Sequence, residues 1–434
     1  MTGEPIDVLR ARAREVLAIN DRGGYTVPTA RLYPFQWNWD SAFVAMGFAT
    51  YDVDRAYREL ERLVEGQWND GMIPHIVFHA RSDDYYPGPD VWGTQERTPF
   101  GAPATTGITQ PPVFATALRY VDDRAAGRGD REQRTHALYR AALRWHRWWM
   151  SARDPDGRGL VAILHNWESG SDNSPAWDDA LARVPATTVN PVRRKDTGHV
   201  DVAMRPRDID YARYIHLVER YRAVEWQPEA MWRIAPFKVA DIQSTAILAR
   251  ASEDLAEVAR RHGTDDERRE IEAMRARLSD AIMRQWSPAH ARFLSRDLVS
   301  DQDIEAPSQA GFVPLAALDL PPAMAADVAR EIARWLDAQP IPCVPSTPST
   351  APQFDAKRYW RGPIWAIINW YVVAGLRRNR QNALADRIET GMVDVIRRSG
   401  LAEYFDPITG EGCGGTSFSW TAAYLLLATD AKGR

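Results

Sequence analysis

The amino-acid sequence predicts an all-α protein, and three observations lead to this fold class. Apolar residues mostly recur at the spacing of amphipathic helices. Few segments alternate between apolar and polar residues, so strand candidates are short and isolated. Tight turns alternate with long loops rich in glycine, proline and aromatic residues. Together these patterns indicate helices paired in a closed ring, with the long loops gathered at one rim.

The apolar spacing predicts about a dozen helices. Two of their starts carry a local signal: Asp40 precedes an apolar stretch, as an N-cap does, and Pro363 follows a glycine at another start. In chain order the expected helices are Ile6–Ile19, Asp40–Phe48, Val53–Trp68, Pro112–Asp123, Arg131–Arg153, Asp210–Arg222, Asp241–His262, Asp265–Gln285, Met324–Ala338, Pro363–Arg378, Gln381–Arg398 and Phe418–Ala428.

Six long loops separate these helices. They occupy residues 21–38, 69–111, 164–206, 287–307, 339–361 and 401–417. Loops of this length inside a compact domain usually carry function. No Ser/Gly-rich linker, charge run or fixed-period repeat divides the chain, so we expect residues 1–434 to form a single domain.

The composition excludes several classes of protein. Of the 434 residues 45% are hydrophobic and 10% aromatic, so the chain can bury enough surface to fold and is not intrinsically disordered. The net charge of −4 argues against a nucleic-acid partner, and no apolar run is long enough to span a membrane. The first residues lack the apolar core of a signal peptide, so we expect a cytoplasmic protein. Two cysteines, Cys343 and Cys413, are too few for a disulfide framework or a zinc cluster.

Tryptophan is unusually frequent, since 17 Trp exceed both the 15 Tyr and the 12 Phe. An indole combines a flat apolar face with one N–H donor, which suits stacking on a sugar ring. For any single tryptophan, packing in the core is an equally good explanation. About half of them lie in or beside the long loops, where polar residues also cluster, and this favours a carbohydrate cleft. These are Trp37, Trp39, Trp68, Trp92, Trp167, Trp177, Trp360, Trp365 and Trp420.

The first segment with candidate chemistry is Leu32–Ala42, LYPFQWNWDSA. It places Tyr33, Trp37, Trp39 and Asp40 where a helix begins. Asp40 is equally well explained as the N-cap of that helix.

The second segment, His165–Asp178 (HNWESGSDNSPAWD), holds Glu168, Asp172 and Asp178 within eleven positions. A glycine and a proline between these acids indicate a shaped loop rather than a charged helix surface. Asp172 is the best candidate for an acid of raised pKa, because the flanking tryptophans can shield it from water. An Asx-turn would explain one of these carboxylates, but not all three together with the indoles.

Two later segments have a similar composition. Tyr359–Trp370, YWRGPIWAIINW, places two aromatic residues before a helix start, beside arginines that either hold loop carboxylates or stay solvated. Ala402–Ala422, AEYFDPITGEGCGGTSFSWTA, holds Glu403, Asp406 and Glu411 in a glycine-rich loop that allows close backbone approach to a ligand. This loop is no nucleotide-binding motif, because no strand precedes it and the glycine spacing differs.

These residues fit glycoside hydrolysis by two carboxyl groups, in which one protonates the leaving oxygen and the other activates water or attacks the anomeric carbon. A Ser/His/Asp triad finds no support, since the nucleophile-elbow motif is missing. We expect neither a metal nor a cofactor. His75 and His79 are spaced at i, i+4 but flank an apolar IVF, so a structural role explains them better.

Five segments together resemble a known family. WESGSDNSPAWD, YWRGPIWAIINW and EYFDPITGEG…FSWTAA resemble the signatures of glycoside hydrolase family sixty-three and its trehalase and glucoamylase relatives. LYPFQWNWDSAF and GQWNDGMIPHIVF are similar, more narrowly, to bacterial mannosylglycerate hydrolases and their glucosylglycerate-hydrolysing counterparts. The matching segments run from about Tyr33 to Trp420 in the family's order. This resemblance implies an (α/α)6 barrel and an inverting mechanism.

Carried over residue by residue, the resemblance implies that Asp172 is the general acid and Glu403 the general base. For an inverting enzyme the two carboxyl groups are expected to lie about 6.5–9.5 Å apart. The resemblance also implies that the sugar pocket is lined by Tyr33, Trp37, Trp39, Asp40, Trp177, Tyr359, Trp360 and Trp365.

The similar enzymes also imply residues for the glycerate end, namely Tyr85, Gln110, Arg205 and Tyr211. Two of these have a neighbour that would serve as well: Tyr86 for the first tyrosine and Arg207 for the arginine. A carboxylate in a cleft needs a charged and preferably bidentate partner. An internal ion pair explains either arginine equally well, the candidate partners being Asp201, Asp208 and Asp210.

The leading hypothesis is an inverting α-glycosidase that acts on a small anionic glycoside, mannosylglycerate or glucosylglycerate. Another α-glucosidase for small substrates, such as a trehalase, is the alternative within the class. A non-hydrolytic sugar-binding barrel or a sugar epimerase is the alternative from another class. We expect an epimerase to use histidines in the cleft, whereas the loop segments offer paired acids. A homo-oligomer is compatible with the sequence.

Overall fold

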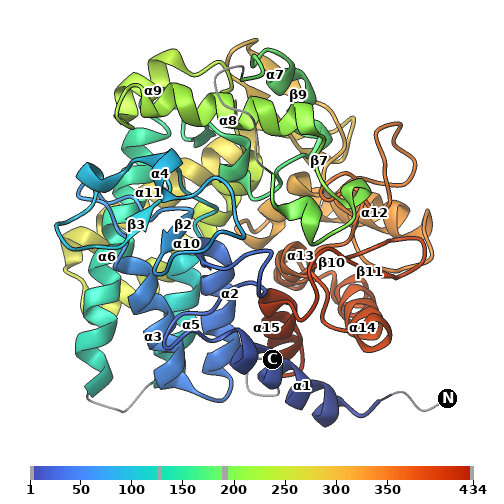
Figure 1. Ribbon diagram of the computed structural model, residues 1–434. Helices are drawn as coiled ribbons and strands as arrows, with labels where there is room; N and C mark the ends of the chain where they lie inside the picture. The colour runs from blue at the N-terminus through green and yellow to red at the C-terminus, as the bar shows by residue number, and fades with distance from the viewer. Residues whose placement is uncertain (1–3, 126–129, 188–193, 431–434) are drawn as a thin grey trace.

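Six helical segments form a closed inner ring, because each packs against the next and the last packs against the first (Figure 1). This arrangement is seen in a computed structural model that describes residues 4–125, 130–187 and 194–430. In ring order the segments are α2 (Asn38–Ala49), α5 (Phe114–Ala125), α10 (Ile242–His262), the 3-10 helix η6 (Gln309–Ala316), α13 (Ala366–Arg378) and α15 (Ser419–Ala428). The inner helices are surrounded on most sides; all twelve residues of α2 are buried.

Six further helices cover the outside of the ring, one against each inner segment. Each follows its inner partner in the chain, apart from α1, which packs on α15. They are α1 (Ile6–Asn20), α3 (Val53–Val64), α6 (Asp130–Ala152), α11 (Asp265–Arg284), α12 (Pro322–Asp337) and α14 (Asn382–Ser399). Outer helices bury one face only; in α3, Ala56, Tyr57, Leu60 and Leu63 lie at helical spacing and point inward.

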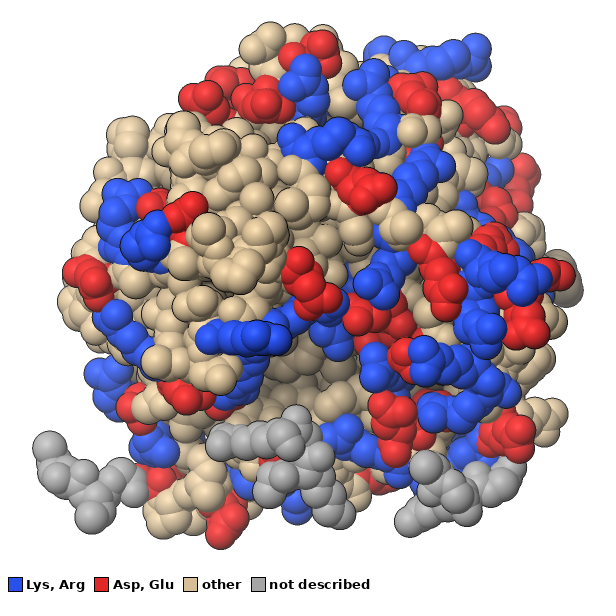
Figure 2. Space-filling model, turned by 180° about the vertical axis from the view of Figure 1, so that it is seen from behind, with Lys and Arg blue, Asp and Glu red and all other residues tan. Residues whose placement is uncertain are grey.

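The two rings make an (α/α)6 barrel, which confirms the fold class expected from the sequence. The buried hydrophobic side chains form one contiguous cluster that runs from Leu9 to Ala428. On the face shown in Figure 2, acidic and basic side chains intermingle rather than forming a patch of one sign. None of the helices in the described residues is both long enough and apolar enough to cross a lipid bilayer.

The strands are short, as the sequence predicts, but they pair into small antiparallel sheets in the connections between the helices. Each described strand has two or three residues. The sheets comprise β1 (Gln36–Trp37), β2 (Ile76–Phe78) and β3 (Ala104–Thr105); β4 (Ala162–Ile163), β5 (Val239–Ala240), β8 (Ser295–Asp297) and β9 (Gln302–Ile304); β6 (Trp286–Ser287) and β7 (Arg292–Phe293); and β10 (Tyr404–Phe405) and β11 (Gly412–Cys413). The register places Trp37 opposite Ile76, and Tyr404 opposite Cys413.

The connections between the barrel helices contain further helices. Helix α8 (Asp208–Arg222) is close to the expected range, whereas the short helices α4, α7 and α9 were not expected. The remaining elements are α4 (Pro89–Trp92), α7 (Asp178–Ala182), α9 (Pro228–Ile234) and the 3-10 helices η1 (Gln95–Arg97), η2 (Asn166–Ser169), η3 (Pro175–Trp177), η4 (Asp196–Gly198) and η5 (Val202–Met204).

Two expected helices differ from the structure for local reasons, and one inner segment was not expected. Helix α3 ends at Val64 rather than at Trp68, whose indole N–H instead donates to a threonine of β3. Helix α13 begins at Ala366 rather than at Pro363, because Ile364 pairs with Phe405 as extended backbone. The inner segment η6 was missed, since its glycine and proline interrupt the helical pattern.

A buried ion pair stabilises the loop between β4 and η3. Arg153 at the end of α6 donates to Glu168 over 2.6 Å, and both side chains are almost fully buried. Glu168 also accepts the backbone N–H of Leu164 over 2.8 Å. An isolated buried charge is costly, so the two side chains depend on each other.

Replacing Glu168 by Gln is therefore expected to lower the free energy of unfolding by about 3–5 kcal/mol, because the Arg153 charge stays buried without its partner. Urea unfolding followed by circular dichroism measures the change. The control is Glu270→Gln, which breaks an exposed pair with Arg147 and is expected to cost less than about 1 kcal/mol. Equal losses in the two variants would contradict this role of the buried pair.

Candidate active site

The long loops enclose a cavity at the end of the barrel where the inner helices begin. Its lining residues belong to the first turns of α2 and α15 or to the connections that lead into the inner helices, which include Tyr211 of α8. The cavity, together with its open mouth, encloses about 660 Å³ of empty space. Eleven of the residues expected at the site line it: Tyr33, Trp37, Trp39, Asp40, Tyr85, Gln110, Asp172, Arg205, Tyr211, Tyr359 and Glu403.

Asp172 lies on the wall of the cavity in the loop between η2 and η3. The loop is fixed from behind, because Asn166 donates to the backbone carbonyl of Asp172 over 2.9 Å and the Trp177 indole donates to that of Ser171 over 2.8 Å. The carboxyl group is surrounded by protein, and this burial raises the pKa of Asp172 to about 8. The positive charge of Arg205 opposes part of the increase. Asp172 therefore carries a proton at neutral pH.

Glu403 directly precedes β10 and is fully buried at the cavity. Its Oε1 accepts a hydrogen bond from the Tyr33 hydroxyl over 2.9 Å, and its Oε2 accepts the backbone N–H of Gly415 over 2.9 Å. Burial raises the pKa of Glu403, while Arg205, Gly415 and Tyr33 lower it in part. These donors fix the carboxyl group and favour its charged form.

Asp40 is the third residue of α2 and points into the same cavity. The N-cap of α2 is Trp37, so the alternative that Asp40 is the helix cap is wrong. Burial, and then the charge of Glu403, raise the pKa of Asp40 well above its usual range. A protonated carboxyl group at this place can donate a hydrogen bond to a ligand.

The other four acids of these loops have structural partners. Glu168 forms the buried ion pair with Arg153, and both oxygens of Asp178 are held by Arg361 over 2.8 Å. Asp406 accepts two backbone N–H groups of its own turn, and Glu411 pairs with a surface lysine. Of the six acids in the two loop segments, Asp172 and Glu403 are the ones that reach the cavity.

Three tryptophans expected in the pocket lie behind its wall instead. Trp360 stacks face to face on Trp365, with ring centroids 3.7 Å apart and an interplanar angle of 2°. The indole N–H of Trp365 is bound to the carbonyl of Tyr359, and that of Trp177 to the carbonyl of Ser171. The expectation that these indoles line the pocket is therefore corrected, since they support the loops that do.

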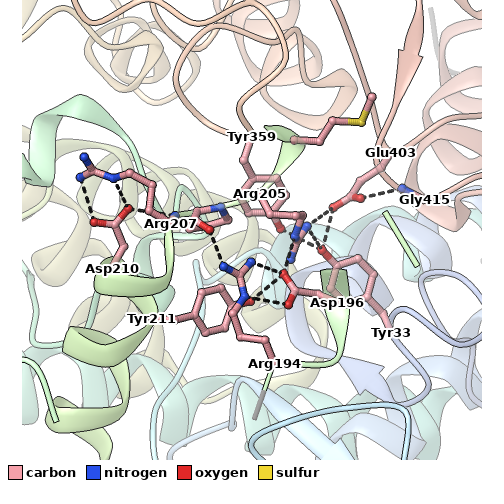
Figure 3. Close-up of polar contacts among 12 residues, drawn as sticks. Tyr33, Arg194, Asp196, Arg205, Arg207, Asp210, Tyr211, Tyr359, Glu403 and Gly415 are labelled. Carbon is pink, nitrogen blue, oxygen red and sulfur yellow. Dashed lines mark hydrogen bonds and ion pairs between the residues drawn. The ribbon is translucent and has the colours of Figure 1, made fainter. Parts of the chain in front are cut away.

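The structure distinguishes the two arginines that the sequence offered for the glycerate end, Arg205 and Arg207, but not the two tyrosines. Arg205 is 2% exposed and lines the cavity, whereas the Arg207 side chain is 62% exposed and pairs with Asp210 (Figure 3). The internal ion pair considered from the sequence is thus present at Arg207. Tyr85 and Tyr86 both line the cavity, so the choice between them stays open.

Several cavity residues were not found by sequence reasoning. His75 was read as structural together with His79; His79 does bind Gln36 over 2.7 Å, but His75 lines the cavity. Burial lowers the pKa of His75 well below its usual range, so its ring is neutral. Asp196 carries no local signal, because it stands in a charged stretch. The aromatic composition of the loops was the signal for Trp167, Phe418 and Trp420, which also line the cavity.

A polar network connects Asp196 to Glu403 across the cavity (Figure 3). Asp196 accepts hydrogen bonds from Arg194 and from Arg205, and Arg205 donates to the Tyr33 hydroxyl over 2.8 Å. Tyr33 in turn donates to Glu403. Among the described side chains, no group of three or more His, Cys, Asp or Glu comes together in a way that would hold a metal ion.

An (α/α)6 barrel whose cavity is lined by several carboxyl groups among aromatic rings, Asp172 and Glu403 included, has the layout of a glycoside hydrolase. The chain belongs to the family described as the mannosylglycerate hydrolase MGH1-like glycoside hydrolase domain, whose model matches residues 33–421.

Individual relatives are similar over nearly the whole chain. Mannosylglycerate hydrolase MGH1 of Selaginella moellendorffii is 43% identical over 98% of this chain and 87% of its own. The glucosylglycerate hydrolase of Mycolicibacterium hassiacum is 35% identical over 96% of this chain and 97% of its own. A crystal structure of the family sixty-three mannosylglycerate hydrolase from Thermus thermophilus, in complex with Tris and D-glycerate, is 44% identical, with a TM-score of 0.92, over 96% of this chain and 99% of its own.

Gly170 is required by the cavity wall. Its φ is +68°, and a Cβ at this position would come within 2.4 Å of the Trp39 indole. Gly170→Ala is expected to lower the free energy of unfolding by about 2–4 kcal/mol, from a left-handed backbone and a displaced ring. Denaturant unfolding measures this loss.

Gly198→Ala is the matched control for Gly170→Ala. A Cβ at Gly198 has no atom within 4 Å, so the change is expected to stay within about 0.5 kcal/mol. Equal stabilities of the two alanine variants would show that the wall tolerates a side chain at Gly170.

Proposed function

We propose that the chain is an inverting α-glycosidase that hydrolyses 2-O-α-mannosylglycerate, 2-O-α-glucosylglycerate or both to hexose and glycerate. The observation that carries the proposal is a single cavity that holds a carboxyl group of raised pKa, a second carboxyl group with fixed donors, and a buried arginine. The names of the relatives, which include both a mannosylglycerate and a glucosylglycerate hydrolase, support the choice of substrate.

Asp172 is the proposed general acid. Because burial keeps its proton on at neutral pH, it can donate that proton to the glycosidic oxygen as the C–O bond breaks. The glycerate then leaves as a neutral alcohol at that oxygen, and Asp172 becomes a carboxylate.

Glu403 is the proposed general base. Its oxygens accept hydrogen bonds from Tyr33 and Gly415, with the Tyr359 hydroxyl as a further neighbour, and a carboxylate has enough lone pairs to bind a water molecule as well. The water gives its proton to Glu403 and attacks the anomeric carbon from the face opposite the leaving group, which inverts the configuration. Asp172 and Glu403 are thereby the proposed catalytic residues.

Two sets of lining residues suit the two ends of the substrate. The hexose end is assigned to the aromatic and acidic side chains at the start of α2, namely Tyr33, Trp37, Trp39 and Asp40, together with Tyr359. The glycerate end is assigned to Tyr85, Gln110, Arg205 and Tyr211, because Arg205 is the buried cation of the cavity. Trp177, Trp360 and Trp365 act from behind the wall.

The lining of the cavity also bears on the two alternative functions, a trehalase and an epimerase. A trehalase would act on an uncharged disaccharide, for which a buried arginine supplies no charge complement. An epimerase is disfavoured because the lining carries one histidine, His75, beside the acids. A single domain over residues 1–434 is supported by the contiguous core. The cytoplasmic location and a homo-oligomer stay predictions from the sequence.

Hydrolysis is tested by incubating the purified protein with each glycerate and following the products by proton NMR. We expect free hexose, first as the β-anomer because an α-linkage is inverted. Intact ligand with measurable binding would favour the sugar-binding alternative, and the α-anomer appearing first would indicate a retaining enzyme.

Asp172→Asn and Glu403→Gln serve as controls in this assay. Each is expected to reduce kcat by about 100-fold or more, since one proton transfer is lost, while the protein stays folded by circular dichroism. Full residual activity in either variant would exclude that residue from the assigned role.

The pH dependence follows from the two carboxyl groups. On the acidic side, activity is expected to fall as Glu403 takes up a proton, and its pKa lies above 4.5 because of burial. On the alkaline side, activity is expected to fall above about pH 8, where Asp172 loses the proton that it must donate. Both effects are checked by measuring kcat across the acidic and alkaline range while folding is monitored in parallel. A kcat that stays undiminished well above pH 8 would contradict the assignment of Asp172 as the general acid.

A further inference from the structure

Asp196 takes part in the cavity, although neither the proposed acid nor the proposed base contacts it. It begins η4 in the loop before α8, and its side chain is largely buried at the cavity wall. Its Oδ2 accepts the Nε–H of Arg205 over 2.9 Å. Asp196 therefore occupies one side of the same guanidinium group that is assigned to the substrate carboxylate.

Arg205 lies between two carboxylates: it forms a hydrogen-bonded ion pair with Asp196 and a longer ion pair, without a hydrogen bond, with Glu403. Its Nε is bound to Asp196, whereas its Nη1 is 3.9 Å from Oε1 of Glu403. The Tyr33 hydroxyl stands between them, because it accepts from Nη1 over 2.8 Å and donates to Glu403 over 2.9 Å. The ring of Tyr359 lies under the guanidinium, with its centroid 4.3 Å away.

The charge on Asp196 is itself stabilised by two residues besides Arg205. Arg194 grips it with two hydrogen bonds, of 3.1 and 2.8 Å, and the Tyr211 hydroxyl adds a third over 3.3 Å. Burial alone would raise the pKa of Asp196, but Arg205 and Arg194 overcome this effect and lower it to about 2. Arg194 is shared between Asp196 and the exposed Asp208, so Asp196 is held by one arginine at the cavity and one at its edge.

A buried arginine without an anionic partner would move toward the nearest carboxylate. For Arg205 that carboxylate is Glu403, only a short shift beyond the present 3.9 Å. A direct pair would occupy a lone pair that the base needs for water, and it would favour the ionised form of Glu403. It would also turn the guanidinium away from the anionic end of the substrate.

We propose that Asp196 is a positioning residue that holds the Arg205 guanidinium off Glu403, so that one arginine faces the substrate carboxylate while the base keeps a free lone pair. This inference rests on the proposed function. In this arrangement the Asp196–Arg205 ion pair serves two purposes: it directs Arg205 toward the substrate carboxylate, and it leaves Glu403 able to bind water.

The dependence of kcat on pH tests the position of Arg205, because the acidic limb of the profile depends on the pKa of Glu403. The charged and titratable groups that face Glu403 from all sides are Arg205, Tyr33, Tyr359, Tyr404, Asp40 and Asp172. Of these groups, Arg205 is the one that Asp196 binds directly. A substitution at Asp196 therefore acts on Glu403 by releasing Arg205, in addition to the loss of its own negative charge, and only the release of Arg205 also changes kcat and KM.

The test compares Asp196→Asn with the wild-type enzyme by measuring kcat and KM across the same pH range. We expect kcat to fall by about 10-fold or more and KM to rise, because the base is blocked and the substrate carboxylate loses its partner. We also expect the acidic limb of kcat to move to lower pH, since closer approach of Arg205 lowers the pKa of Glu403. A purely structural defect would lower kcat without moving this limb.

Asp208→Asn is the matched control. Asp208 pairs with Arg194 over 2.9 Å on the same loop, but its side chain is 90% exposed and does not reach the cavity. Its variant is expected to keep kcat and KM within about twofold, with the wild-type pH profile. Asp196→Glu, which keeps the charge, is expected to recover most of kcat and the wild-type acidic limb; if Asp196→Asn does not fold, this variant decides.

The outcomes separate the inference from the function on which it rests. Wild-type protein that releases hexose from neither glycerate would overturn the proposed function and the inference with it. An active wild-type enzyme with an Asp196→Asn variant that keeps its kcat within about threefold, or its acidic limb unmoved, would overturn the inference alone. A folded Asp196→Glu variant that behaves like the inactive Asp172→Asn enzyme would do the same.

Discussion

The barrel closes where α15 packs against α2, and the site depends on this closure. The two helices approach closely because Gly47 faces Ala423, and a Cβ on Gly47 would lie 2.9 Å from the Ala423 backbone. Asn20, the last residue of α1, also holds the start of α15. Its amide donates to the carbonyl of Ser417 over 2.8 Å and to the Ser419 hydroxyl over 2.9 Å. Closure brings the two ends of the chain together, so that Tyr33 and Glu403, 370 positions apart, meet in one cavity.

Within that cavity, similar carboxyl groups are distinguished by their donors. Asp172 has few donors to its oxygens, and the surrounding protein raises its pKa and keeps it protonated. Glu403 is more deeply buried, but it receives hydrogen bonds from Tyr33 and Gly415, which favour its charge. Two carboxyl groups of the same chemistry can thus serve as acid and base. The difference is made by the backbone and by one tyrosine, not by the acids themselves.

The sequence predicted the class of fold, most helices and the segments that reach the cavity. Periodic apolar spacing reports burial on one face, so long outer helices were found most reliably, whereas η6, interrupted by Gly311 and Pro314, was not. Trp360 and Trp365 were placed in the pocket, because a sequence shows that an indole is near a loop but not which side of the wall it occupies. Asp196 was missed, since its role comes from Arg205 and Arg194, and only the folded loop shows which charges pair.

The closure between α2 and α15 also has a consequence for synthesis of the chain. Tyr33 and Trp39 leave the ribosome early, but Glu403 and the helix that seals the ring come last. A nascent or truncated chain that ends before Glu403 would hold the acid without the base and would expose the apolar sides of α2 and α13. Such contacts between distant parts of the chain form slowly during folding. A chain without α15 therefore neither closes the ring nor brings the acid and the base into one cavity.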